Sequence, residues 1–230
     1  METNDAIKVR EVQNNILYTY QKDMSKHVPA SEANRINMVW QSMPSQLVKE
    51  NKKFVYGVAK PGGRAKDFEV AIQWLMDAGL VYKSERVTRP EMPLKFYADV
   101  SSFKLFLLDC GLLAAMNETP PEILLVANKG MGEFKGAFTE NYVMGQLVAA
   151  CGKSVFYFTN DAKLEIDFFI QHGCDIVPIE AKAEENLRSK SLASFINSHP
   201  DMRGLRFSMS DYREQDWMTN VPLYAASIYF

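Results

Sequence analysis

The sequence predicts a mixed α/β protein in which a helical first half precedes a half built around a sheet. In the first half, apolar residues recur at helical spacing, most clearly between Arg64 and Ala78. In the second half, the segments 164–170 and 175–183 are rich in apolar and β-branched residues, which is typical of strands. Of the 230 residues, 47% are hydrophobic, which is enough for one large domain or two small ones.

The first half follows the order helix, helix, turn, helix and β-hairpin, which is typical of a winged helix-turn-helix domain. Ser31 is the expected N-cap of the second helix, and Pro44 is the expected start of a short third helix. The expected elements are helices 5–24, 31–42 and 64–78, the short helix from Pro44, and strands 54–56, 80–86 and 103–108. We therefore predict an N-terminal helix at 1–28, a winged-helix domain at 29–117, a linker at 118–135 and an α/β domain at 136–230.

Basic residues gather before and at the start of the last helix of this domain, although the whole chain has a net charge of −2. This basic cluster consists of Lys49, Lys52, Lys53, Lys60, Arg64 and Lys66. Lysine, arginine and helix N-termini are common phosphate contacts, so we predict that the basic cluster binds DNA. The alternative is a protein-interaction role, because Asp67 and Glu69 argue against insertion of the last helix into a major groove.

Two acids and a lysine lie on the two strands of the second half. Asp167 is on the first strand, and Glu180 and Lys182 are on the second. His172-Gly173 between the strands offers a hairpin turn. A loop of two or four residues centred there sets Asp167 opposite Pro178, with Glu180 and Lys182 on the same face. A loop of odd length would instead place the acids on opposite faces.

Such a group of residues is a minimal site for metal-assisted phosphodiester hydrolysis. Mg²⁺ takes one or two carboxylates, keeps several waters and contacts phosphate oxygens. A neighbouring lysine can orient or deprotonate the attacking water, or stabilise charge on the phosphate. The alternative is a sheet edge whose polar residues face solvent. The apolar neighbours on both strands favour the first interpretation, since ionisable side chains are costly there unless they are paired or bound to something.

Glu140 fits the same scheme. Apolar residues at positions 143, 144, 147 and 148 predict a helix with one buried stripe. Glu140 lies one turn before Met144, at the edge of that stripe, from where it can reach the sheet. The alternative is a favourable acid in the first turn of a helix.

The order of a helix with a glutamate, a strand, a strand with an aspartate, a strand with Glu-x-Lys and a helix resembles the PD-(D/E)XK, or restriction-endonuclease-like, superfamily. The whole chain also resembles the C-terminal half of a prokaryotic family of AAA-type ATPases, in which a winged-helix segment precedes a nuclease-like domain. The resemblance rests on residues 104–113, 136–141, 165–168 and 178–182. It implies that the catalytic residues are Glu140, Asp167, Glu180 and Lys182, while Ile166 replaces the proline of the motif.

The resulting prediction is a nuclease-like domain, an endodeoxyribonuclease that depends on Mg²⁺ or Mn²⁺. Asp167 and Glu180 would hold the metal, Lys182 would act on the water or the phosphate, and Glu140 would assist. The alternative is a non-catalytic module that binds DNA or a protein and is regulated by an ATPase half that this chain lacks. The resemblance implies an ATPase domain upstream as a partner, so we expect a fragment or a truncated gene product. ATP is not expected in this chain, because its glycines do not fit the Walker pattern.

The composition argues against several other classes of protein. The three cysteines are widely spaced and the three histidines are scattered, so neither a disulfide framework nor a zinc site is indicated. The N-terminus is polar, and the longest apolar run, 105–116, is too short to span a bilayer. We therefore expect a cytoplasmic protein without a membrane partner, and a homo-oligomer is compatible with the sequence.

Overall fold

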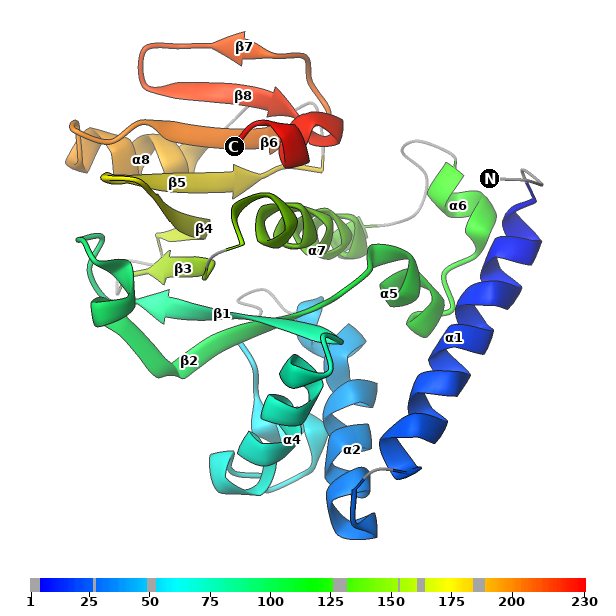
Figure 1. Ribbon diagram of the computed structural model, residues 1–230. Helices are drawn as coiled ribbons and strands as arrows, with labels where there is room; N and C mark the ends of the chain where they lie inside the picture. Colours follow the sequence, from blue (N-terminus) through cyan, green and yellow to red (C-terminus); the bar gives the residue numbers. More distant parts are fainter. Residues whose placement is uncertain are drawn as a thin grey trace. The chain divides into compact units, whose positions relative to one another are not determined.

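The computed structural model describes residues 5–26, 28–48, 53–125, 132–152, 154–160, 164–183 and 189–230. The chain divides into two compact units (Figure 1). Unit 1 comprises Met1–Tyr82 and Leu105–Phe138, and unit 2 comprises Lys83–Lys104 and Thr139–Phe230.

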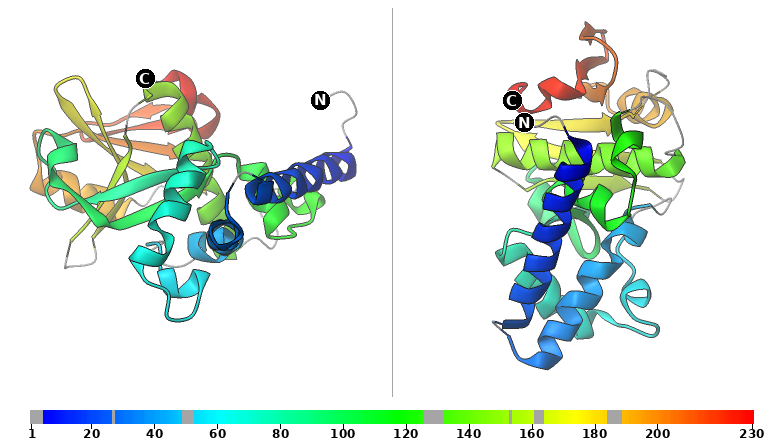
Figure 2. Two further views of the ribbon diagram at one scale, coloured as in Figure 1. Left: turned by 60° about the horizontal axis from the view of Figure 1, so that its bottom comes forward. Right: turned by 90° about the vertical axis from the view of Figure 1, so that its right-hand side faces the viewer.

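Unit 1 is helical. Its elements are α1 (Ala6–Lys26), α2 (Ala30–Leu47), α3 (Tyr56–Ala59), α4 (Ala65–Asp77), α5 (Cys110–Met116), α6 (Pro121–Leu125) and the first residues of α7 (Gly132–Cys151). The helices α1 and α2 meet at one end and diverge from there (Figure 2), and α2 packs against α4. Trp40 of α2 and Phe68 of α4 are each 1% exposed, so these two helices supply much of the core of the unit.

The helix predicted at 64–78 is confirmed as α4. One face of it is buried through Phe68, Ala71, Ile72 and Leu75. At its start, the carboxylate of Asp67 accepts a hydrogen bond of 3.0 Å from the backbone N–H of Arg64. The helix is followed by Gly79 at a φ of +68°, a conformation in which glycine carries no steric penalty.

The short helix expected from Pro44 is instead part of α2, and Pro44 is an interior residue of that helix. An interior proline costs about 3 kcal/mol because it removes one backbone hydrogen bond and crowds the preceding turn. The buried stripe of α2 nevertheless continues across it, from Trp40 through Met43 to Leu47. Burial of these side chains therefore offsets the cost of the proline.

The strand expected at 54–56 is also wrong, since α3 begins at Tyr56. The side chain of Gln46 exchanges two hydrogen bonds of 3.0 Å with the backbone N–H and C=O of Val55. A buried glutamine thus satisfies the polar backbone groups that strand pairing would otherwise have to satisfy.

Within the described residues, unit 2 is built on a mixed sheet of eight strands, in the order β2-β1-β3-β4-β5-β6-β8-β7. The strands are β1 (Val81–Val87), β2 (Ala98–Leu107), β3 (Phe156–Thr159), β4 (Glu165–His172), β5 (Asp175–Ala181), β6 (Gly204–Ser208), β7 (Arg213–Glu214) and β8 (Met218–Pro222). β4 pairs antiparallel with β3 and β5, whereas β1 pairs parallel with β3, and β6 pairs parallel with β5 and β8. The predicted mixed α/β class is confirmed.

The two strands expected to form the wing, β1 and β2, belong to this sheet. β1 pairs with β3 from Glu85 to Val87 and has β2 on its other side. Because β1 is hydrogen-bonded on both sides, it is an interior strand of the sheet and not part of a free hairpin. The chain passes from unit 1 to unit 2 between Phe138 and Thr139, close to the start of the α/β domain predicted at 136, but unit 2 also includes Lys83–Lys104 with most of β1 and β2.

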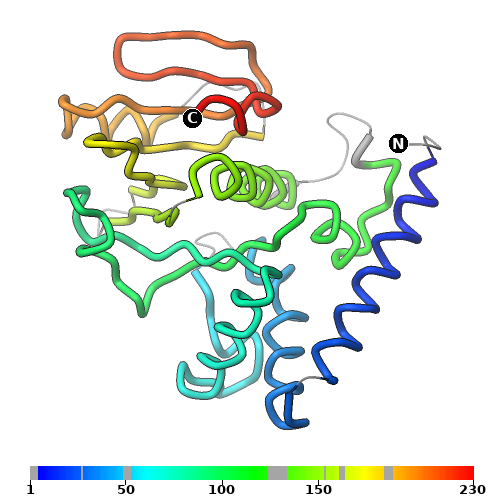
Figure 3. The backbone as a smooth tube through the Cα atoms, in the orientation of Figure 1, coloured from blue at the N-terminus to red at the C-terminus, as the bar shows by residue number. Residues whose placement is uncertain are grey.

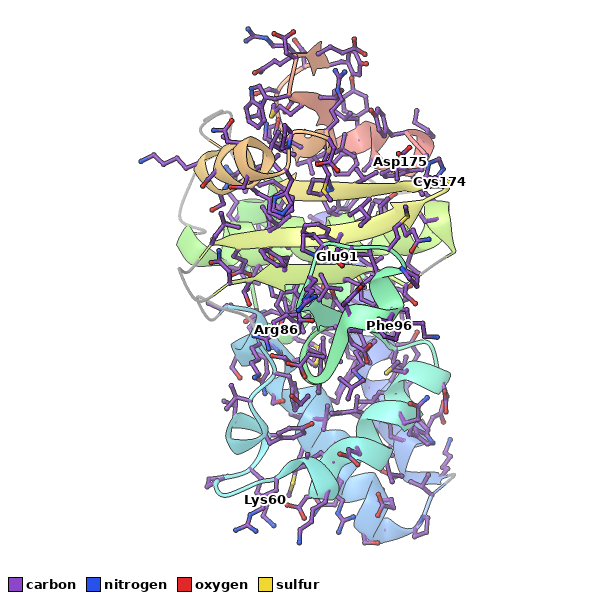
Figure 4. All side chains as sticks on the ribbon, turned by 90° about the vertical axis from the view of Figure 1, so that its left-hand side faces the viewer. Lys60, Arg86, Glu91, Phe96, Cys174 and Asp175 are labelled. Carbon is purple, nitrogen blue, oxygen red and sulfur yellow. The ribbon has the colours of Figure 1, made fainter. Side chains whose placement is uncertain are left out.

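Two helices cover the sheet of unit 2. The helix α8 (Lys190–Ser198) lies on one face, and α7 lies on the other (Figure 4). Phe195 of α8 packs against Phe158 and Phe169, with ring centroids 5.6 and 5.3 Å away. The hydrophobic core on this face also contains Val87, Leu94, Phe156, Ile166, Ile176, Leu192, Ile196 and Met218. Among the described residues of both units, no helix has both the length and the apolar character needed to cross a membrane.

β8 ends at Pro222, and the 3₁₀ helix η2 (Leu223–Ile228) follows it (Figure 3). Pro222 pairs with Ser208, which is the last residue of β6. Beyond this pair the neighbouring strand stops, so residues 223–228 have no ladder to extend.

We expect Phe195→Ala to lower the free energy of unfolding by roughly 3–5 kcal/mol, because it opens a cavity beneath α8. Phe96→Ala is the control: Phe96 is 78% exposed (Figure 4), so its loss should change the free energy by less than about 0.5 kcal/mol. Urea unfolding followed by circular dichroism measures both. Equal effects of the two substitutions would contradict the packing of α8 against β3 and β4.

Candidate functional site

The turn between β4 and β5 determines which side chains of the two strands meet. It consists of two residues, Gly173 and Cys174, and His172 pairs with Asp175 across it. Figure 4 shows Cys174 and Asp175 at this tip of the hairpin. Gly173 adopts a φ of +61°, as expected in a tight two-residue turn. Of the two alternatives the loop has the even length that the proposed site requires, but the turn lies one residue later than the expected His172-Gly173.

The shifted turn corrects the predicted register. Pro178 pairs with Phe169 and not with Asp167. The ladder ends at the pair Phe168 and Ile179, and the next positions on the two strands are Asp167 and Glu180. Asp167 Oδ2 also accepts a hydrogen bond of 2.9 Å from the backbone N–H of Ala181. The two predicted metal ligands are thus direct cross-strand neighbours, closer than the diagonal arrangement expected from the sequence.

Lys182 lies beside these acids, as predicted. Its Nζ is 2.8 Å from Glu180 Oε1. Burial alone would lower the pKa of Lys182, but the nearby carboxylates of Glu180, Asp167 and Glu140 together outweigh burial and raise it. The side chain is therefore a protonated ammonium group at neutral pH. In this state it can stabilise negative charge and orient a water, but it cannot accept a proton.

Glu180 is almost completely buried, at 5% exposure. One carboxylate oxygen, Oε1, contacts Lys182. The other, Oε2, is buried and has no hydrogen-bond partner among the described residues. A buried carboxylate oxygen without a partner is costly, and it is available to a cation.

A polar row that the sequence analysis missed continues from Glu180 across the sheet. Glu180 is in register with Arg206 of β6, and Arg206 is in register with Asn220 of β8. The guanidinium of Arg206 donates to Asn220 Oδ1 at 2.8 Å and to Ser189 Oγ at 3.0 Å. Ser208 donates to the same oxygen of Asn220 at 2.7 Å. This network fixes Arg206, which interacts electrostatically with Glu180.

Lys104 of β2 is a second residue that the sequence analysis missed. Its side chain is fully buried, and its ammonium group forms an ion pair with Glu165 of β4. The same group lies 4.7 Å from the centre of the Tyr157 ring. A signal was present in the sequence, because Lys104 is an ionisable residue inside the apolar strand segment 103–108.

Electrostatics link Lys104 to the predicted catalytic residues. Burial lowers the pKa of Lys104, but Glu140, Glu165 and Asp167 together have the larger effect and raise it. Glu140, from α7, is 6% exposed and interacts with both Lys104 and Lys182. This coupling agrees with an acid that reaches the sheet from the edge of its helix.

These side chains form what we call the charged cluster. Its members are Glu140, Glu165, Asp167, Glu180, Lys104, Lys182 and Arg206. Four carboxylates and three cations give it a formal charge of −1. The elements follow the expected order: α7 with Glu140, then β3, β4 with Asp167, β5 with Glu180, and α8.

The charged cluster fits a divalent cation with few protein ligands. Asp167 and Glu180 provide two neighbouring carboxylates, and Glu180 Oε2 is an oxygen that needs a partner. Mg²⁺ commonly uses one or two carboxylates and completes its shell with water and phosphate oxygens. A dedicated cage does not fit, because no group of three or more His, Cys, Asp or Glu side chains in the described part of the chain is arranged to hold a metal.

The basic cluster belongs to unit 1. Lys53, Lys60, Arg64 and Lys66 are all exposed, and Figure 4 shows Lys60 on the turn between α3 and α4. Lys60 also lines a hollow of about 440 Å³, together with residues that include Arg35 and Asp67. Lys49 and Lys52 lie outside the described residues.

Comparison with protein families covers both halves of the chain. Residues 2–122 match the family described as Domain of unknown function (DUF8612), which is more than half of the chain. The chain belongs to the DUF8612 family. Residues 135–225 match Domain of unknown function (DUF4143), a domain found in C-terminal regions associated with AAA ATPases. No curated protein and no solved structure matches the chain.

The charged cluster draws residues from both matched regions. Its members in the DUF4143 match are Glu140, Glu165, Asp167, Glu180, Lys182 and Arg206. Lys104 comes from the DUF8612 match, as do β1, β2 and the basic cluster. The interval between the matches, 123–134, lies within the linker predicted at 118–135.

We expect Lys104 to make the stability of the folded chain sensitive to alkaline pH. Its pKa is higher in the folded chain than in the unfolded chain, where it is about 10.4. Its contribution to the free energy of unfolding is therefore fully present below that pH and is lost as the pH rises through the folded value. Urea unfolding of the wild type and Lys104→Met between pH 8 and pH 11 tests this. The wild type should lose more stability than the variant, and two parallel curves would contradict the assignment.

Proposed function

We propose that unit 2 is a metal-dependent nuclease of the PD-(D/E)XK type that hydrolyses phosphodiester bonds in DNA. The observation that carries the proposal is the pair of neighbouring carboxylates, Asp167 and Glu180, with one buried oxygen of Glu180 lacking a partner among the described residues. An ammonium group, Lys182, lies 2.8 Å from the other oxygen of Glu180. Acids and a lysine held together in a largely apolar sheet are expensive unless they are paired or bound to something, and Glu180 Oε2 is the oxygen that pairing leaves over.

Electrostatics explain why such a site needs a cation. The charged cluster has a formal charge of −1, so it would repel a DNA phosphate. A bound Mg²⁺ or Mn²⁺ would polarise the phosphoryl oxygen and lower the pKa of a coordinated water. Asp167 and Glu180 are the side chains that would hold it.

The remaining residues of the cluster have distinct roles in the proposal. Lys182, as an ammonium group, stabilises the charge that develops on the phosphate and orients the attacking water. Glu140 is close enough to Lys182 to interact with it electrostatically, so it helps to fix the position and charge of that side chain. Arg206 is fixed by Asn220 and Ser189, and it supports Glu180 from the neighbouring strand.

The double variant Asp167→Ala/Glu180→Ala should lose Mn²⁺ binding and plasmid nicking together. Loss of several kcal/mol of charge stabilisation predicts a fall in the nicking rate on the order of 100- to 1,000-fold. Calorimetry with Mn²⁺ and a nicking assay measure the two effects. The matched control is Asp175→Ala/Asp201→Ala, which removes two exposed acids of the same unit outside the charged cluster.

Two results would contradict the nuclease proposal. One is nicking by the double variant at the rate of the wild type, which would assign the activity to other residues or to a contaminant. The other is a folded wild-type protein that binds neither Mn²⁺ nor Mg²⁺. In the second case the chain would be a binding module.

A non-catalytic binding function is the second candidate, and the exposed basic residues of unit 1 favour it. In this alternative, Lys60, Arg64 and Lys66 contact DNA phosphates around the start of α4. An ATPase domain, supplied outside the residues of this chain, would regulate that binding. The match to a domain found in regions associated with AAA ATPases supports this part of the proposal.

The variant Lys60→Ala/Arg64→Ala/Lys66→Ala should bind duplex DNA more weakly and with less dependence on salt. If each side chain contacts one phosphate, the plot of the logarithm of the association constant against the logarithm of salt concentration should become less steep, its negative slope decreasing in magnitude by roughly 3. Fluorescence anisotropy at several salt concentrations measures the slope. The control Lys8→Ala/Lys22→Ala/Lys26→Ala removes three exposed lysines of α1. An equal change in both variants would show only a general charge effect.

A further inference from the structure

We infer that Lys104 takes the place of a second metal ion, so that the charged cluster holds a single divalent cation. This inference rests on the proposed nuclease function, because it concerns the metal stoichiometry of the same site. It assigns a role to a residue outside the predicted Glu, Asp and Glu-x-Lys positions. It also links the region that matches DUF8612, which supplies Lys104, to the metal site.

The surroundings of Lys104 make it a fixed internal cation. Its side chain has no exposed surface, and its ammonium group is ion-paired with Glu165. The Tyr157 ring, 4.7 Å away, provides a second favourable contact for the positive charge. Glu140 and Asp167 also interact electrostatically with Lys104. Together with Glu165, three of the four carboxylates in the cluster therefore interact with this one ammonium group.

The formal charges agree with a single metal ion. The cluster carries −1, one divalent cation brings it to +1, and one phosphodiester then makes the assembly neutral. A second divalent cation would leave an excess of two positive charges in a buried site, which is unfavourable at low dielectric. Without Lys104 the cluster would carry −2 and would have an unneutralised carboxylate at Glu165.

A single metal ion also assigns a role to Lys182. In sites with two metal ions, about 3.5–4 Å apart, one ion contacts the attacking oxygen and the other contacts the leaving oxygen. With one ion, a protein cation must stabilise the remaining charge. Lys182 is the partly exposed ammonium group beside Glu180, whereas Lys104 is enclosed. Lys104 therefore determines how many metal ions bind, and Lys182 is the ammonium group that stabilises charge on the reacting phosphate.

The test is calorimetric titration of the full chain with Mn²⁺ alone, without DNA. The wild type should bind one ion. Lys104→Met removes the internal charge at similar length and should bind a second ion or bind the first at least about tenfold more tightly. Lys104→Met/Glu165→Gln removes both partners of the ion pair, restores the formal charge to −1, and should return to one ion with an affinity close to that of the wild type.

Lys83→Met is the matched control. Lys83 also has a carboxylate partner, Glu85 at 2.7 Å, and lies 4.7 Å from an aromatic ring, that of Phe103, but it is not part of the charged cluster. Its loss should leave the stoichiometry and affinity for Mn²⁺ unchanged. Thermal unfolding followed by circular dichroism checks that each variant is folded, and the charge-balanced double variant still tests the proposal if Lys104→Met alone does not fold.

The outcomes separate this inference from the proposed function. Two ions bound by the wild type, or one ion with the same affinity in the wild type and Lys104→Met, would overturn the role of Lys104 and leave the nuclease proposal intact. A double variant that binds two ions would overturn the role of charge. Failure of the wild type to bind Mn²⁺ would overturn both proposals.

Discussion

Burial of Lys104 is the constraint on which the arrangement of unit 2 depends. An ammonium group with no exposed surface costs several kcal/mol unless oppositely charged groups surround it. Lys104 meets this requirement through Glu165 of β4, the ring of Tyr157 on β3, and the electrostatic influence of Glu140 on α7. One side chain of β2 therefore interacts with residues of three other elements, β3, β4 and α7. For this reason β1 and β2 are part of the sheet of unit 2 and do not form a separate wing.

The two matched families consequently share one structural unit. The DUF8612 match contains β1 and β2, and the DUF4143 match contains the other strands of the sheet. β1 occupies the edge of β3 through parallel pairing, so a chain cut between the matches would expose that edge. It would also separate Lys104 from Glu165. The chain does pass from one unit to the other between Phe138 and Thr139, but Lys83–Lys104 of the DUF8612 region also belongs to unit 2 and contributes directly to the charged cluster.

Features set by local chemistry were predictable from the sequence. Gly79 directly follows the end of α4, and the helical spacing of Leu192, Phe195 and Ile196 matches the buried side of α8. The sequence left the parity of the β4–β5 loop open, and the observed even loop is the alternative that places Asp167 and Glu180 on one face. The position of the turn was not predictable either, since His172-Gly173 and Gly173-Cys174 are both acceptable turn sequences. A shift of one residue changed Asp167 from a partner of Pro178 to a neighbour of Glu180.

Other features depend on residues far apart in the chain, and no local pattern encodes them. The ion pair of Lys104 with Glu165 spans 61 positions, so the sequence showed an ionisable residue in a strand but not its partner. Pairing of β1 with β3 is similarly remote. The net charge of the cluster follows only from these contacts. A network that only stabilised the fold would be more stable with a net charge of zero and with a hydrogen-bond partner for Glu180 Oε2. This cluster has a net charge of −1, and Glu180 Oε2 has no such partner among the described residues. In the proposed function, a bound cation would balance the net charge of the cluster and give the buried oxygen Glu180 Oε2 a partner.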